Sequence, residues 1–137
     1  MTPEVHPVLD GKQIEFVSRP LLSKVGTIGS DGSPHVTPTW YVYEDGKFTI
    51  TTAERTVKVQ NIRRDNRVSL LIDDAYKYVI VKGKAEINKR RDVQKETARL
   101  AVRYLGEEGA GKILPDIMKI KHVIIEVTPR DVLSYNL

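Results

Sequence analysis

Hydrophobic and polar residues alternate along much of the first half of the chain, which is the pattern of strands that bury one face. Residues 24–29, 34–43 and 47–52 alternate in this way, and Asp31-Gly32 and Asp45-Gly46 lie between them. Asp-Gly between alternating runs is a strong hairpin signal, because both residues tolerate the positive φ of a tight turn. The pattern predicts an antiparallel meander.

The second half of the chain contains longer apolar runs, which predict strands at residues 67–72, 76–88, 122–128 and 132–135. A straight strand over residues 76–88 would extend about 43 Å. That length is too great for a chain of 137 residues that folds as a small domain. We therefore expect the strand to bend at Gly83.

Three segments have helical periodicity. Residues 12–18 predict a short helix that Arg19-Pro20 would end. Residues 52–64 predict a second helix, and residues 92–105 a third with one apolar face, made of Val93, Thr97, Leu100, Ala101 and Tyr104. The sum of these elements predicts a mainly β fold, a small antiparallel β-barrel with a few flanking helices, formed by residues 1–137 as a single domain.

The segment 34–43 contains a proline within its strand pattern. Pro38 shares one face with Val36, Trp40 and Val42, while the other face carries His35, Thr37, Thr39 and Tyr41. Proline donates no hydrogen bond, so the ladder is interrupted there by an edge or a bulge. Such an interruption either frees backbone groups for a ligand or protects an edge strand from aggregation.

Positive charge is concentrated in one part of the chain. The chain has 22 Lys and Arg against 18 Asp and Glu, a net charge of +4. Residues 51–72 contain five basic residues and two acids, and so account for three of these charges. With a pI of about 9.3, the chain suits an anionic partner, either nucleic acid or a phosphorylated cofactor.

The start of the predicted helix 52–64 suits a phosphate. Thr51 and Glu54 fit a capping box, and Arg55 and Lys58 flank the apolar face near the helix N-terminus, where free N–H groups attract anions. On the same helical wheel Arg64 points to the opposite side, so Arg63 and Arg64 are expected to be solvated. The alternative is an amphipathic helix whose charges serve only solubility.

Taken in order, these motifs resemble those of the pyridoxamine 5′-phosphate oxidase-like split-barrel flavoproteins. The resemblance covers residues 20–88 and rests on Asp-Gly-Ser-Pro, Val-Thr-Pro-Thr-Trp, a second Asp-Gly, and Arg-x-x-Lys-x-x-Asn-Ile-Arg-Arg-Asp. It implies a homodimer of six-stranded antiparallel split β-barrels with FMN or the deazaflavin F-420 at the subunit interface.

The resemblance also implies a set of cofactor-binding residues. Arg55 and Lys58 would hold the cofactor phosphate, helped by Thr51 and Thr52. Thr37, Pro38 and Thr39 would lie along the ring system. Tyr76 and Tyr78 would reach the cofactor of the neighbouring subunit.

Departures from the motifs of true pyridoxamine-phosphate oxidases narrow the resemblance. Where those enzymes have Ser-Arg-Lys-Gly and a C-terminal motif rich in Trp and Arg, this chain reads AERTVK and TPRDVLSYNL. The pattern is closer to the deazaflavin-dependent reductase branch. F-420 is slightly preferred over FMN, because Arg63, Arg64 or Arg67 would contact its anionic oligoglutamate tail.

Several other chemistries are excluded or disfavoured. The chain has no cysteine, which removes disulfides and thiolate chemistry. His6, His35 and His122 are too far apart in sequence to predict a metal site. Residues 106–113 resemble a P-loop, but Ile113 replaces the required Ser or Thr, so we expect a surface loop. No signal sequence or membrane span is predicted, and we expect a cytoplasmic protein.

Three functions remain open at this point. The first is an FMN- or F-420-dependent oxidoreductase that transfers a hydride to or from a small conjugated substrate, with the cofactor rather than a side chain carrying the chemistry. The second is an FMN-binding protein for electron transfer or cofactor storage. The third is a nucleic-acid-binding barrel that stacks bases on Trp40, Tyr41 and Tyr43.

Overall fold

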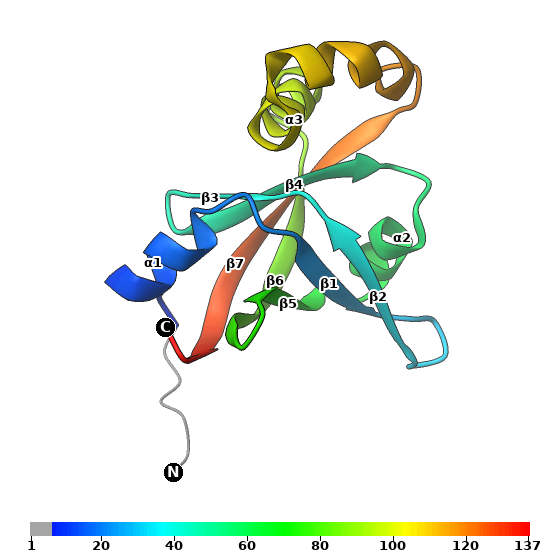
Figure 1. The fold of residues 1–137 in the computed structure, drawn as a ribbon. Helices are drawn as coiled ribbons and strands as arrows, with labels where there is room; N and C mark the ends of the chain where they lie inside the picture. The colour runs from blue at the N-terminus through cyan, green and yellow to red at the C-terminus, as the bar shows by residue number, and fades with distance from the viewer. Residues whose placement is uncertain (1–6) are drawn as a thin grey trace.

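One antiparallel sheet of seven strands and three helices make up the computed structural model, which describes residues 7–137 (Figure 1). The strands are ordered β2-β1-β5-β6-β7-β4-β3 across the sheet. In chain order the elements are α1 (Gly11–Val17), β1 (Ser23–Ile28), β2 (Pro34–Thr39), β3 (Val42–Glu44), β4 (Lys47–Ala53), α2 (Val57–Arg64), β5 (Arg67–Asp74), β6 (Lys77–Asn88), α3 (Val93–Ile117) and β7 (His122–Tyr135).

The two edges of the sheet are joined by only two residues. β2 ends at Thr39 on one edge and β3 begins at Val42 on the other, so Trp40 and Tyr41 alone connect them. Three Cα steps span at most about 11 Å. The sheet must therefore curl until its edges almost meet at this link, and beyond it β2 and β4 diverge. This geometry is an open, or split, barrel.

The structure has seven strands, one more than the six that the resemblance implied, and two of the boundaries predicted from the sequence differ. Residues 34–43, predicted as one strand, form two strands on opposite edges, because the chain changes partner at the link. Residues 122–128 and 132–135, predicted as two strands, are one continuous strand that passes through Pro129. The mainly β, antiparallel character of the fold is confirmed.

The long strands β6 and β7 join the part of the sheet that contains β5 to the part that contains β4. β6 pairs with β5 up to Lys84, whereas β7 pairs with β4 from His122 to Val127 and with β6 from Ile124 to Tyr135. Their register shifts between Lys82 and Gly83, where Arg130 of β7 has no partner on β6, so the ladder is irregular at the glycine where a bend was predicted. A Cβ atom at this glycine would lie 2.2 Å from the carbonyl oxygen of Thr128.

Gly83→Ala is therefore expected to lower the free energy of unfolding by about 1–3 kcal/mol, because the crowding atom belongs to the backbone and cannot move aside cheaply. Gly11→Ala is the matched control, since a Cβ there meets nothing within 4 Å. We expect this control to be neutral or slightly stabilising. Chemical denaturation measures both variants, and equal effects would contradict the close approach at Gly83.

The inside of the curl is filled by alternate residues of the strands. On β5, Val68, Leu70 and Ile72 are buried while their sequence neighbours are exposed, which is the period-two pattern of a half-buried strand. The same inner face carries fully buried side chains from other strands and from α1: Val17, Val25, Phe48, Ile50, Val79, Val81, Val127 and Val132. The core thus lies within the barrel.

The short helix α1 forms as the sequence predicts. Asp10 caps it by accepting the N–H of Gln13, and the Gln13 side chain accepts the N–H of Asp10 in return. This reciprocal capping box satisfies two backbone donors at the start of a helix of only seven residues. The helix ends at Val17, just before Arg19-Pro20.

The second helix starts later than predicted. α2 begins at Val57 after Thr56, and no side-chain bond caps it. Thr51 belongs to β4, and Glu54 instead forms ion pairs with Arg63 and Lys121. The predicted capping box of Thr51 and Glu54 is therefore wrong, because pairing with β7 holds residues 51–53 extended.

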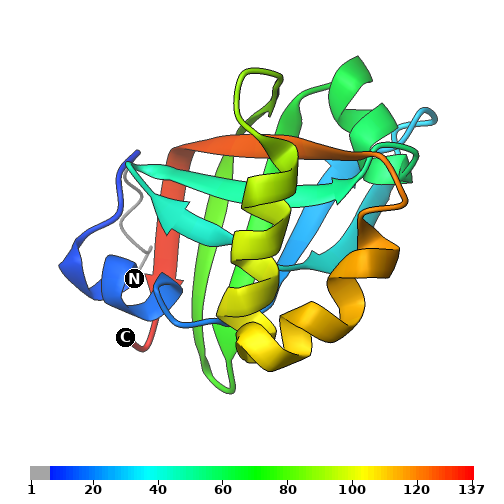
Figure 2. The ribbon, with the colours of Figure 1, turned by 90° about the horizontal axis from the view of Figure 1, so that it is seen from above.

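The third helix is longer than predicted. Residues 106–113, predicted as a loop, are mostly helical, and α3 continues to Ile117. Gly106 interrupts it with φ 72° and ψ 172°, a conformation that glycine accepts readily. Figure 2 shows the two halves of α3 at an angle to each other. Within residues 7–137, no helix is both long and apolar enough to span a membrane.

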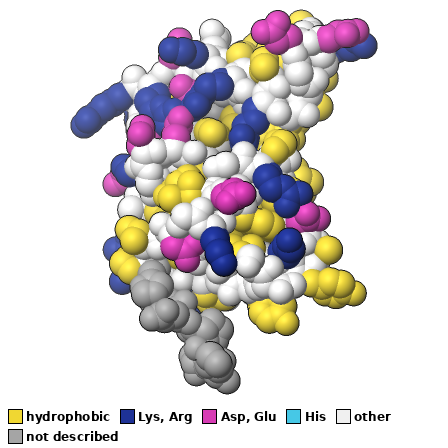
Figure 3. Space-filling view, turned by 60° about the vertical axis from the view of Figure 1, so that its left-hand side comes forward, with side chains coloured by type: hydrophobic (Ala, Val, Ile, Leu, Met, Phe, Trp, Pro, Cys, Tyr) yellow, Lys and Arg dark blue, Asp and Glu magenta, His cyan; other side chains and the backbone are white. Residues whose placement is uncertain are grey.

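Charges of both signs share the molecular surface. The space-filling view in Figure 3 shows basic and acidic side chains intermixed with hydrophobic ones on one face. Many of the basic groups are held in ion pairs, such as Arg19 with Asp74 and Lys24 with Asp73. A basic side chain without an acidic partner therefore indicates a binding site for an anion better than positive charge alone does.

Candidate functional site

The candidate site lies where β2 and β4 diverge. β3 pairs with β4 only between Lys47 and Thr49, so residues 50–53 of β4 extend past it and pair with β7 alone among the described strands. β2 is the other border, and its outer edge has no strand partner within residues 7–137. α2 connects β4 to β5 beside this opening (Figure 1).

Buried hydroxyl groups line the β2 side of the opening. Thr37 and Thr39 lie on the half-buried face of β2, and Ser23 of β1 lies directly opposite Thr39 in the ladder. The hydroxyl oxygens of all three are buried and have no hydrogen-bond partner among the described residues. Because leaving a buried hydroxyl unpaired is costly, this part of the barrel suits a polar ligand edge or water.

Lys58 supplies a buried positive charge on the other side. It lies in the first turn of α2, and only 7% of its surface is exposed. Its Nζ is 3.4 Å from Oγ1 of Thr52, and it forms no ion pair with a carboxylate of residues 7–137. Burial lowers the pKa of its ammonium group. A buried cation without an anion nearby is costly, and a bound phosphate would compensate it.

Arg55 and Arg64 share a shallow cleft. Arg55 lies between β4 and α2, is exposed, and forms no hydrogen bond or ion pair with residues 7–137. The cleft has a volume of about 390 Å³, and its lining includes both arginines, His35, Asn61 and the turn before β2. The predicted placement of Arg64 on the opposite side is wrong, because Arg55 precedes the helix and the helical wheel does not apply to it.

Asn61 is a buried residue that the sequence reasoning missed. Its Nδ2 donates to Oγ1 of Thr27 at 3.0 Å, which ties α2 to β1. Its Oδ1 accepts from Nη1 of Arg64 at 3.3 Å, and the same guanidinium donates to the carbonyl of Ile28. The signal in the sequence was a polar residue next to Ile62 on the apolar face of the helix. Asn61 therefore orients Arg64 toward the cleft.

Comparison with known proteins places the chain in a family. The family model described as pyridoxamine 5′-phosphate oxidase matches residues 9–136. The chain belongs to this family. The expectation drawn from the ordered motifs is thus confirmed.

Several solved structures have a similar fold. A conserved hypothetical protein, Rv2991, from Mycobacterium tuberculosis is 28% identical with a TM-score of 0.77, covering 99% of this chain and 90% of its own. An F420 reductase is 24% identical with a TM-score of 0.73, over 91% and 98%. General Stress Protein 26 from Bacillus anthracis is 16% identical with a TM-score of 0.63, over 88% of both chains.

Most of the cofactor-binding residues predicted from the sequence lie in two groups. Thr37, Pro38 and Thr39 on β2 form one border of the opening, and Thr52, Arg55 and Lys58 form the other. Thr51 is next to Thr52 on β4, but its side chain points to the opposite face of the strand, the face of Thr49. Tyr76 and Tyr78 lie elsewhere in the same subunit. Tyr76 is 82% exposed in the turn before β6, and Tyr78 stacks on Tyr135 with ring centroids 5.5 Å apart.

Two of the remaining arginines are engaged with acids. Arg63 donates to Glu54 at 3.2 Å, and Arg67 donates to Asp65 at 2.7 Å. Of the three arginines considered for an anionic tail, Arg64 is therefore the one without a carboxylate partner among the described residues.

The three histidines lie in different places. His35 lines the same cleft as Arg64, His122 lies on β7, and His6 lies outside the described residues.

The aromatic residues considered for base stacking are used within the fold. Tyr41 is fully buried, Trp40 stacks on Tyr104, and Tyr43 packs on Phe48 with ring centroids 4.8 Å apart. They do not form an exposed row along a sheet. The structure therefore gives no support to a nucleic-acid-binding surface on this strand.

Proposed function

We propose that this protein is an FMN- or F-420-dependent oxidoreductase that transfers a hydride to or from a small conjugated organic substrate. The observation that carries the proposal is the buried ammonium of Lys58, which has Thr52 beside it and no carboxylate partner among the described residues. Membership of the pyridoxamine 5′-phosphate oxidase family supports it. It is not a true pyridoxamine-phosphate oxidase, because the substrate motifs of those enzymes are replaced.

The residues present fit such a cofactor. Lys58 and Arg55 would hold its phosphate, with a hydroxyl donor from Thr52, whereas Thr51 points to the opposite face of β4. Thr37 and Thr39 would offer their unpaired hydroxyls to the polar edge of the ring system, whereas Pro38 points to the opposite face of β2 and would not contact that edge. When bound, the cofactor supplies the hydride chemistry, while this chain binds it, orients it and excludes water.

We further propose that the working form is a homodimer with the cofactor at the subunit interface. The opening between β2 and β4 lies at the free outer edge of β2, which has no strand partner among the described residues, and the nearby cleft is shallow. A second copy of the chain would cover it. Tyr76 and Tyr78 would then belong to the neighbouring subunit's site.

F-420 is our preferred cofactor over FMN. FMN ends at one phosphate, whereas F-420 continues into an oligoglutamate tail. Arg64 lines the same cleft as Arg55 and has no carboxylate partner among residues 7–137. The similarity to an F420 reductase fold is consistent with this preference. An exposed charge pair contributes only about 0–1 kcal/mol, so the difference in affinity is expected to be small.

Mass spectrometry of the chromophore that copurifies from the native host, followed by titration with FMN and F-420, tests the proposal. We expect one cofactor per subunit, and tighter F-420 binding with a steeper loss of affinity as salt rises. Binding of neither cofactor would overturn the proposed function. Tighter FMN binding or equal salt dependence would overturn only the deazaflavin preference.

A further inference from the structure

The link between the two sheet edges is held by α3. The N–H of Tyr41 donates to the hydroxyl of Tyr104 at 3.0 Å, and Nε of Arg103 donates to the carbonyl of Tyr41 at 3.0 Å. The indole of Trp40 stacks on the Tyr104 ring, with centroids 5.2 Å apart and planes 9° apart. Two consecutive helix residues thus bind both residues of the link.

The same two helix residues also bind the segment that precedes β1. The hydroxyl of Tyr104 donates to the carbonyl of Leu21 at 2.7 Å. Nη2 of Arg103 donates to the carbonyls of Arg19 and Ser18 at 3.0 and 3.2 Å. Because Ser23 pairs with Thr39, this fixes the start of β1 and the end of β2 relative to one helix.

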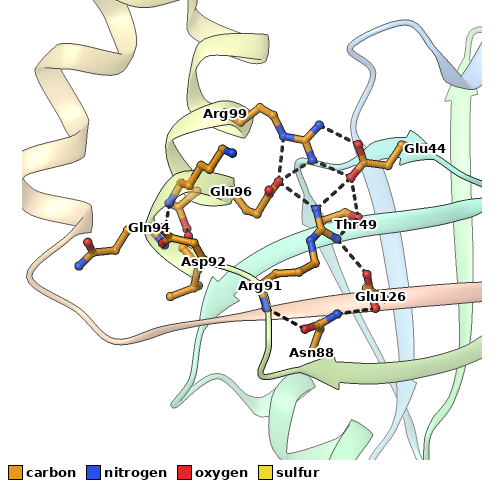
Figure 4. A network of polar contacts seen from close by, with 12 residues as sticks. Glu44, Thr49, Asn88, Arg91, Asp92, Gln94, Glu96, Arg99 and Glu126 are labelled. Atoms are coloured by element: carbon orange, nitrogen blue, oxygen red, sulfur yellow. Dashed lines mark hydrogen bonds and ion pairs between the residues drawn. The ribbon is translucent and has the colours of Figure 1, made fainter.

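The other end of this half of α3 is anchored independently of the link. Figure 4 shows Glu96 joined by dashed lines to Arg91 and Arg99. Both arginines are joined to Glu44 of β3, and Arg91 is also joined to Glu126 of β7. Hydrogen bonds from Arg99 and Arg91 hold the pKa of Glu44 at about 2. The part of α3 between these ion pairs and Gly106 therefore connects β3 and β7 to Trp40 and Tyr41 as one rigid element.

We propose that Arg103 and Tyr104 are positioning residues that set the separation of β2 from the end of β4, and thereby the affinity for the cofactor. Thr39 directly precedes the link, so a shift of Trp40 and Tyr41 moves its hydroxyl relative to Lys58. The expected effect on cofactor affinity rests on the proposed function, whereas the expected effect on the backbone of β2 and the link does not.

Tyr104→Phe tests this inference, because it keeps the aromatic stack on Trp40 and removes the hydroxyl that serves Tyr41 and Leu21. Glu96→Gln is the matched control at the other end of the same half-helix, where it weakens the ion pairs with Arg91 and Arg99. Arg103→Lys is a second variant, which keeps the charge and loses the fork that reaches three carbonyls.

Hydrogen exchange of cofactor-free protein is the first measurement. We expect Tyr104→Phe and Arg103→Lys to speed amide exchange in residues 37–43 by about tenfold and to leave residues 47–53 unchanged. Glu96→Gln should lower Tm without this local change. Equal exchange in the variants and the control would overturn the positioning role and leave an ordinary stabilising contact.

Cofactor dissociation, followed by flavin or deazaflavin fluorescence, is the second measurement. We expect Tyr104→Phe to raise the dissociation rate about tenfold and Glu96→Gln to leave it within twofold. Faster exchange with unchanged dissociation would overturn the link between the helix and the cofactor. If the wild type binds no cofactor, the proposed function fails, and hydrogen exchange alone decides whether α3 positions β2.

Discussion

Lys58→Met is expected to weaken cofactor binding about 10- to 150-fold, while the cofactor-free protein stays as stable as the wild type or becomes more stable. A charge-assisted hydrogen bond to phosphate contributes about 1.5–3 kcal/mol, and each 1.4 kcal/mol is a factor of ten. In the cofactor-free protein, the same ammonium is buried without a carboxylate partner among residues 7–137, so methionine removes a desolvation cost. The two effects therefore have opposite signs.

Fluorescence titration and chemical denaturation measure the two effects on the same samples. Arg55→Ala combined with Lys58→Ala should lose more affinity than Lys58→Ala alone. Arg63→Met is the control, because Arg63 is exposed and paired with Glu54, and it should change affinity little. Equal losses of affinity at Lys58 and Arg63 would point to a diffuse basic surface. A large loss of stability in Lys58→Met would show that the lysine is structural.

The lowered pKa of Lys58 has a further consequence for the dependence on pH. A lysine whose pKa is lower in the folded than in the unfolded protein binds fewer protons when folded, so stability rises with pH between the folded value and the ordinary 10.5. As pH rises through that window, the cofactor-free protein should become more stable, and the affinity for the cofactor should fall because Lys58 loses its charge. Lys58→Met should show neither trend.

The fold was largely predictable because period-two alternation or a continuous apolar run, bounded by turn residues, marks most strands of the barrel. What alternation could not show was the change of partner at Trp40 and Tyr41. The alternation of side chains continues from Thr39 to Val42, although the chain crosses from one sheet edge to the other. Only the pairing of the distant strands β1 and β4 decides where the strand must divide.

The site was partly predictable, and the missed parts share a physical cause. Lys58 and Arg55 were identified by resemblance, whereas Arg64 was placed by a helical phase counted from the wrong start. That start was wrong because long-range pairing of β4 with β7 overrides local capping preferences. Likewise, glycines predicted a loop at residues 106–113, yet the helix resumes after Gly106 and buries Ala110.

One face of the sheet has the composition expected of a dimer interface. On the outer side of β2, β1, β5, β6 and β7, one ladder row contains Pro38, Lys24, Leu71, Ile80 and Leu133, and the neighbouring rows add Val36 and the stacked Tyr78 and Tyr135. Val36 is 61% exposed and Leu71 37%. Gly26, Ser69 and Val36 line a hollow of about 590 Å³ in this face, whose rim also carries the charged residues Arg67, Lys82, Arg130 and Asp131. Five strands at about 4.8 Å spacing make it about 19 Å wide.

This face adjoins the candidate site because both use β2. Val36 and Pro38 point outward from the strand, while Thr37 and Thr39 point inward toward the opening. A second copy docked on the outer face would therefore lie directly beside the proposed cofactor ring. The stacked Tyr78 would lie within that interface, as expected for a residue that reaches the neighbouring subunit's cofactor.

Leu71→Glu is accordingly expected to convert a dimer to a monomer, because it places a charge within an apolar contact. We expect it also to lower cofactor affinity by more than roughly 100-fold, because the partner subunit completes the site. Leu105→Glu is the control: Leu105 is 43% exposed on α3, away from this face, and its replacement should change neither property. Light scattering coupled to chromatography reports the mass, and cofactor absorbance reports occupancy. A wild-type monomer that carries cofactor would exclude the shared site, whereas a Leu71→Glu dimer with normal affinity would place the interface on another surface.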